Sequence, residues 1–156
     1  MTNRKSAGRR SATTVASRAA ASSEWLRAGI AELITLTTVI DTGTRTVVAR
    51  IAVGRNPIQL HATPDGRFVY VANQGSEEEP ANTVSVLDVA RGIVVDTIRT
   101  GAGAHGVAVS DDGRYVFVTN IVDGTVSLIE AASRSVIATF AVGQGPNGVT
   151  FAPGRA

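Results

Sequence analysis

The chain has 156 residues, of which 44% are hydrophobic and 18% are charged, and its formal net charge is +2. This length and apolar content fit one globular domain with its own core, and no run of eighteen apolar residues predicts a membrane-spanning helix. Cysteine is absent from the sequence, which excludes disulfide and thiol chemistry.

The positive charge is concentrated at the N-terminus. Residues 1–23 hold five basic side chains and no acidic one, whereas residues 24–156 hold ten basic and thirteen acidic side chains. The larger part of the chain is therefore mildly acidic. It has no basic surface of the kind that predicts nucleic-acid binding.

Residues 1–34 form a basic leader with a composition of its own. Its first part is rich in Ser, Thr and Arg, which predicts disorder. From residue 12 to residue 34 the alanine content favours an amphipathic helix, with Trp25, Leu26, Ile30 and Leu33 on its apolar side. Charged residues interrupt this stretch, so it does not read as a secretion signal.

From residue 37 to residue 156 the sequence repeats itself. FVYVAN at 68–73 matches YVFVTN at 115–120, and Gly54 matches Gly101 and Gly143 at spacings of 47 and 42 residues. The five extra residues lie in a longer loop, QGSEEEPA, after residue 73. Runs of β-branched and aromatic residues bounded by Gly, Asp and Asn indicate strands and hairpins. Four strands in a repeat of about 42 residues predict the blades of a β-propeller.

The expected fold is all-β, with blades built as four-stranded antiparallel meanders. Residues 35–156 are expected to hold a partial first blade at 37–54, full blades at 55–100 and 101–142, and the first strand of another blade within 143–156. The expected strands are 37–41 and 46–53; 59–63, 68–73, 83–88 and 93–100; 106–110, 115–120, 125–130 and 135–142; and 148–151. These eleven strands make an incomplete ring.

The repeated motifs resemble a known family. PDGRFVYVAN, SDDGRYVFVTN, NTVSVLD and the Val-Gly pair after each fourth strand resemble the YVTN-type β-propeller repeat. That family is similar to lactonase-like seven-bladed propellers and to surface-layer propeller proteins. The resemblance implies an extracytoplasmic setting (periplasmic, secreted or cell surface) and a role in binding or scaffolding.

Two candidate ligand-binding residues lie at the predicted mouth of the propeller channel. His105 precedes an innermost strand, and Asn147 occupies the same repeat position in the next blade. The second histidine, His61, falls within a strand at a different level, so no metal pair is expected. The stretches 101–106 and 143–148 fit G-x-G-x-x-G, but a strand follows each instead of a helix. Their glycines are therefore expected to serve the crossing between blades and not a dinucleotide.

The acidic residues divide into two groups. Those that recur in every blade, at the end of the third strand or in the hairpin after the first, are expected to shape turns: Asp41, Asp88, Glu130, Asp65 and Asp112. Glu77, Glu78 and Glu79 break the repeat. They are a candidate contact for a cation or a basic partner, with a solvated loop as the alternative.

Catalytic residues, metal ligands and cofactors are not predicted. Fewer than three blades leave apolar faces uncovered, which indicates a fragment of a longer propeller, self-association, or an open arc. The function expected is non-catalytic binding or scaffolding, through a protein partner or self-association. The alternatives are a lactonase-like or lyase-like enzyme whose channel site other blades or subunits complete, and a truncated product without independent function.

Overall fold

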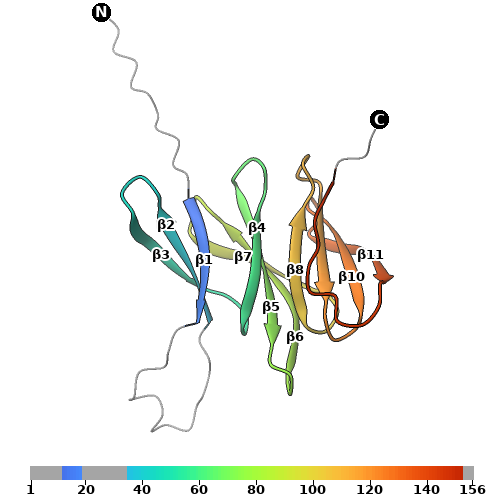
Figure 1. Ribbon diagram of the computed structural model, residues 1–156. Helices are drawn as coiled ribbons and strands as arrows, with labels where there is room; N and C mark the ends of the chain where they lie inside the picture. The colour runs from blue at the N-terminus through green and yellow to red at the C-terminus, as the bar shows by residue number, and fades with distance from the viewer. Residues whose placement is uncertain (1–11, 19–34, 153–156) are drawn as a thin grey trace, which may run out of the picture.

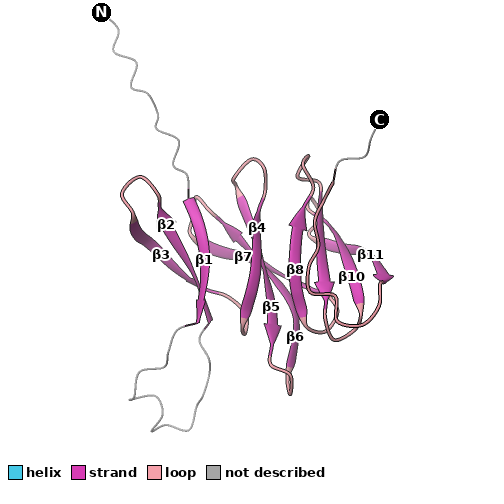
Figure 2. Ribbon diagram, viewed as in Figure 1, coloured by secondary structure: helices cyan, strands magenta, loops and turns pink. Residues whose placement is uncertain are grey.

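The computed structural model describes residues 12–18 and 35–152. Within those ranges the chain forms eleven strands and no helix (Figures 1 and 2). The strands are β1 (Ala12–Arg18), β2 (Thr35–Asp41), β3 (Thr46–Ala52), β4 (Pro57–Ala62), β5 (Phe68–Gly75), β6 (Pro80–Asp88), β7 (Ile93–Arg99), β8 (Ala104–Val109), β9 (Tyr115–Asn120), β10 (Thr125–Glu130) and β11 (Ser135–Ala141).

The strands form three antiparallel sheets in which each strand pairs with its neighbours along the chain. Their orders are β1-β2-β3, β4-β5-β6-β7 and β8-β9-β10-β11, called blades 1, 2 and 3 below. The sheets stand side by side, and β4 and β8 are neighbours at the inner side (Figure 1). This arrangement confirms the predicted all-β fold of propeller blades in an open, partial ring.

The core lies between the faces of successive blades. Ile51 of blade 1 packs with Val69, Val71 and Leu87 of blade 2. The opposite face of blade 2 packs against blade 3 in a larger cluster that includes Tyr70, Val84, Val86, Ile98, Val107, Val116, Val118 and Ile129. Each blade therefore has a rear face toward the preceding blade and a forward face toward the next one.

The recurring aspartates shape turns, as predicted. Asp65 Oδ1 accepts the Thr63 hydroxyl at 2.6 Å and the Arg67 N–H at 3.0 Å. Asp112 repeats this pattern with the Ser110 hydroxyl and the Arg114 N–H at the same two distances. The hydroxyl donated by Thr63 lowers the pKa of Asp65, and the hydroxyl donated by Ser110 lowers the pKa of Asp112.

The acidic residues after the third strands also bind local backbone or side-chain groups. Asp41 Oδ1 accepts the N–H of Gly43 and of Thr44, and Asp88 Oδ1 accepts the N–H of Arg91. Glu130 accepts the Ser133 hydroxyl at 2.7 Å.

The glycines that begin each crossing between blades lie against a buried asparagine. Asn120 donates from Nδ2 to the hydroxyls of Thr125 and Ser127, both at 2.9 Å. A Cβ atom added to Gly101 would lie 2.7 Å from Asn120 Cγ and 2.8 Å from Asp123 Oδ2. Gly54 stands in the same way against Asn73 in the preceding blade. Packing of this kind, and not a phosphate site, accounts for the glycine at position 101.

The N-terminal segment differs from the prediction. Residues 12–18, expected as the beginning of a helix, form β1 and pair antiparallel with β2 from Ala12↔Asp41 to Arg18↔Thr35. The free edge of β2 offers backbone hydrogen bonds along its whole length, and the segment is rich in β-branched residues, so tertiary pairing outweighs the alanine content. The rest of the leader, including Trp25 and its expected apolar side, lies outside the described residues.

The last expected strand is also not formed. Residues 148–151 have an extended sequence pattern, but within the described part of the chain no strand pairs with them. They lie instead against blade 3, where the ring of Phe151 stacks on Phe117 at 6.0 Å between centroids. A strand needs a hydrogen-bonded neighbour, and blade 3 already has its four strands.

The turn aspartates predict how stability depends on acid. Because their pKa values are lowered in the folded state, their contribution to the free energy of unfolding is present above the ordinary pKa of 3.8 and is lost as pH falls through the folded value. We expect the doubly substituted variant Asp65→Asn, Asp112→Asn to show a shallower fall of melting temperature between about pH 5 and pH 2 than the original chain. Asp111→Asn is the matched control, since it removes a charge from the same turn and leaves the bonds of Asp112 in place; an equal flattening in it would contradict the prediction.

The crossing glycine predicts a second effect. Gly101→Ala forces a methyl group onto Asn120 and Asp123, and we expect overpacking to lower the free energy of unfolding by about 1–3 kcal/mol in chemical denaturation. Gly148→Ala is the control, because a Cβ there meets nothing within 4 Å. Equal stability of the two variants would show that the crossing has room to relax.

Candidate functional site

The innermost strands β4 and β8 meet along the seam between blades 2 and 3. Gln59 Oε1 accepts the N–H of Val107 at 2.9 Å, and His61 Nδ1 accepts the N–H of Val109 at 3.3 Å. The other edge of β8 is paired with β9. Side chains of one blade thus satisfy backbone donors on the inner edge of the next, which ties the two blades together beside the channel.

The bond from the Val109 N–H sets the tautomer of the His61 ring. Since Nδ1 accepts a hydrogen bond, the neutral ring carries its proton on Nε2. Neither nitrogen then offers a lone pair to a metal ion. The predicted strand position of His61 is confirmed, since it lies in β4. Its partner on β8 depends on how the two blades pack and had no local signal in the sequence.

His105 has the opposite arrangement. It lies half-buried on β8, with Nδ1 at 2.8 Å from the backbone carbonyl oxygen of Asn147. A carbonyl oxygen only accepts, so Nδ1 donates, and in the neutral ring Nε2 keeps its lone pair. A carbonyl that holds one ring nitrogen while the other remains available is the usual support of a metal-bound histidine.

Gly106 allows this contact to form. A Cβ atom at Gly106 would lie 3.2 Å from Gly148 Cα and 3.3 Å from the Asn147 oxygen, so the chain at 147–148 passes directly over it. The structure therefore brings together the two residues predicted for the channel mouth. The contact uses the backbone carbonyl of Asn147 and not its side chain, and Asn147 is an exposed residue.

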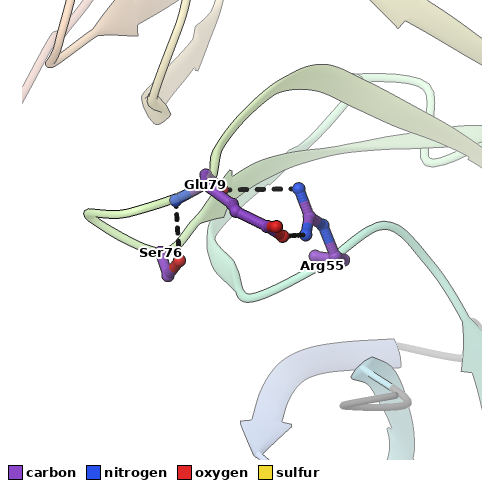
Figure 3. A network of polar contacts seen from close by, with 3 residues as sticks. All are labelled: Arg55, Ser76 and Glu79. Atoms are coloured by element: carbon purple, nitrogen blue, oxygen red, sulfur yellow. Dashed lines mark hydrogen bonds and ion pairs between the residues drawn. The ribbon is translucent and has the colours of Figure 1, made fainter. Parts of the chain in front are cut away.

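The acidic loop is anchored from the crossing between blades 1 and 2. Arg55 forms an ion pair with the Glu79 carboxylate and donates to the Glu79 carbonyl oxygen at 3.4 Å, while the Glu79 N–H donates to Ser76 Oγ at 3.0 Å (Figure 3). The loop thus has one carboxylate engaged by a guanidinium, and Glu77 and Glu78 are exposed. Sequence spacing predicted three equivalent acids, but the approach of Arg55 distinguishes one of them.

A hollow of about 460 Å³ lies away from the inner strands, between β7 and the outer strands of blade 3. Its lining residues are Arg99, Thr100, Gly101, Asp123, Thr125, Ser127, Val136 and Thr139. Several of its polar groups already serve the blade crossing, because Asp123 accepts the Ala102 N–H at 2.7 Å and Asn120 donates to Thr125 and Ser127. Sequence reasoning missed this hollow, since it is formed by strands about 25 to 45 residues apart in the chain.

The described ranges, 12–18 and 35–152, contain neither a metal-binding cluster of side chains nor a helix that could span a membrane. Three or more His, Cys, Asp or Glu side chains do not gather there in a group that could hold a metal ion. Nor is any helix there long and apolar enough to cross a membrane.

Comparison with solved structures finds propellers several times larger than the matched part of this chain. Hydrazine synthase of Kuenenia stuttgartiensis is 27% identical, with a TM-score of 0.66 over 72% of this chain and 32% of that chain. The dihydro-heme d1 dehydrogenase NirN, solved in complex with DHE, is 30% identical, with a TM-score of 0.62 over 76% of this chain and 26% of that one. Apo AztD from Citrobacter koseri, 16% identical with a TM-score of 0.61 over 74% and 31%, supports the fold alone.

The chain thus spans about a third or less of the length of these proteins. No curated protein matches it. The model of one protein family does match, over residues 36–147, which is most of the chain and includes both complete blades. The chain belongs to the cytochrome D1 heme domain family.

Proposed function

We propose that the chain is a non-catalytic binding module of a β-propeller, which holds a tetrapyrrole at the mouth of the channel through His105. The observation that carries this proposal is the oriented imidazole, with Nδ1 held by the Asn147 carbonyl and the lone pair of Nε2 available. The family is named for a heme, and one similar structure contains DHE, which suggests the class of ligand.

The donor chemistry of the site fits an iron tetrapyrrole better than a free metal ion. A tetrapyrrole would supply most of the ligands of its iron, so the protein would need to contribute one side-chain nitrogen instead of a cluster of side chains. His105 meets that requirement, whereas the bond from Val109 leaves His61 without a lone pair on either nitrogen. The sequence alone predicted no cofactor; the family and the orientation of His105 together make one the candidate.

The lactonase-like or lyase-like alternative requires acids, histidines or arginines from several blades around one channel. That alternative remains a prediction, and no contact among residues 35–152 favours it over binding. The YVTN character of the repeat and the extracytoplasmic setting are part of the proposal and rest on the sequence resemblance. The exposed carboxylates of Glu77 and Glu78 are the proposed contact for a basic protein partner.

Titration with hemin tests the proposal. We expect the original chain to bind hemin with the absorbance change of histidine coordination, and His105→Ala to weaken binding by about tenfold or more. His61→Ala is the matched control and should bind as the original chain does. Asn147→Ala should also bind normally, because the backbone carbonyl and not the amide holds His105. Equal binding by the His105 and His61 variants, or none by the original chain, would overturn the proposal.

A further inference from the structure

Within the described residues, blade 1 has three strands where blades 2 and 3 have four. The β-bulge between Val39 and Ile40 in β2 recurs between Val86 and Leu87 in β6 and between Leu128 and Ile129 in β10. This shared irregularity aligns β2 with the third strand of the other blades, β3 with the fourth and β1 with the second. Within the described residues, the inner edge of β1 therefore lacks the strand that β4 and β8 supply in blades 2 and 3.

Residues 148–151 align in the repeat with β4 and β8, the first strands of blades 2 and 3. Val149 matches Val107 of β8 and Leu60 of β4 in the repeat, and Gly148 matches Gly106. The segment already lies beside β8, through the contacts of Asn147 with His105, Gly148 with Gly106 and Phe151 with Phe117. It occupies the place of an innermost strand but has no strand partner in the described part of the chain.

The forward face of blade 3 carries exposed apolar side chains on its outermost strand, β11. Phe140 is 51% exposed, whereas Ile51 and Ile98, at the same repeat position in blades 1 and 2, are 7% and 5% exposed. Ile137, on the same strand, is exposed as well, while its counterpart Val95 packs against the core between blades 2 and 3. Both positions are ones that a following blade normally buries.

The rear face of blade 1 also carries exposed apolar side chains. Val47 is 45% exposed, whereas its counterparts Val94 and Val136 each pack against the core shared with the preceding blade. Ile40 stands where Leu87 and Ile129 are buried. Blade 1 thus presents to solvent the same kind of surface that blades 2 and 3 bury.

A contact between an arginine and an aromatic ring joins blades 2 and 3, and the residues for a second such contact are present on blades 1 and 3. Arg134 of blade 3 reaches back to blade 2, where its guanidinium lies 5.1 Å from the centre of the Phe68 ring. Arg45 holds that repeat position in blade 1, and both residues have the left-handed backbone, with φ of 58° at Arg45 and 53° at Arg134. The ring that corresponds to Phe68 in blade 3 is Tyr115. Arg45 of a second copy would therefore meet Tyr115 as Arg134 meets Phe68.

We propose that residues 148–151 of one copy of this chain pair with the inner edge of β1 in a second copy, and so complete its first blade. Backbone hydrogen bonds then join the copies, as in other cases of strand addition, and the forward face of blade 3 covers the rear face of blade 1. The contact is head-to-tail, and two such contacts close a pair of chains into a ring of six four-stranded blades, within the usual four to eight. The pairing does not depend on the proposed ligand.

The solution mass of residues 1–156, measured by light scattering without hemin, tests this arrangement. We expect twice the 16.1 kDa of one chain, with a melting temperature that rises with protein concentration. Phe140→Asp places a charge in the shared face, and Val149→Pro removes a backbone donor from the added strand. Both variants should be monomers that retain the circular dichroism of β-sheet. Neither residue is buried in a single copy, and Val149 lies outside the paired strands, whereas the side chain of Phe140 on β11 is 51% exposed.

Val122→Asp is the matched control, because Val122 is equally exposed but lies in the turn between β9 and β10. It should remain a dimer. A monomeric original chain, a dimer that survives both Phe140→Asp and Val149→Pro, or open-ended polymers in place of a closed pair would each overturn the proposal. Since hemin is absent throughout, failure of this test leaves the ligand proposal untouched, and the reverse also holds.

Discussion

The burial of one sheet face against the next is the interaction on which this structure depends. Each blade contributes a few small and β-branched side chains per strand, too few to form a core alone, and the cores appear only where two blades meet. The crossing glycines pack against buried asparagines, and hydrogen bonds between β4 and β8 join the inner edges of blades 2 and 3. The stability of the fold therefore comes from contacts between adjacent blades. The outward faces of blades 1 and 3 lack such contacts.

The same stacking creates the candidate site. Side chains of β4 accept hydrogen bonds from backbone N–H groups of β8. In the segment that follows blade 3, the backbone carbonyl of Asn147 accepts a hydrogen bond from the side chain of His105 on β8. Two histidines with equal intrinsic chemistry are thereby given different roles. One is fixed as an acceptor inside a seam, and the other is held as a donor and keeps its second nitrogen available.

The local features of the fold could be predicted from the sequence because their causes are local. Asp65 and Asp112 lie two residues after the hydroxyls that they bind, and the spacing of Gly54 and Gly101 revealed the repeat. What the sequence could not provide depends on contacts between distant segments. The strand at 12–18 forms because β2 offers it an edge, and residues 148–151 remain unpaired because blade 3 already has its four strands.

The site was predictable only in part, for the same reason. Alignment of the repeats predicted that His105 and Asn147 occupy equivalent positions in successive blades. The path of the chain over Gly106 explains why the backbone carbonyl of Asn147, and not its side-chain amide, contacts His105. In the acidic loop, Arg55 comes from a crossing more than twenty residues earlier and engages one glutamate of three. Such pairing has no signature in the spacing of the loop itself.

The loop between β5 and β6 has a wider consequence for how propellers of this kind diversify. Blade 2 is five residues longer than blade 3, yet its strands keep the register and the bulge of blade 3. The extra length lies at the tip of this hairpin, where β5 extends to Gly75 and β6 begins at Pro80, with a register shift between Asn73 and Gly75. Hydrogen bonds of Glu79 with Arg55 and Ser76 hold the turn between these strands. A hairpin tip on this rim can thus be lengthened without a change in the pairing of the strands behind it. New surface chemistry can be introduced there, one blade at a time, while the inter-blade cores stay as they are.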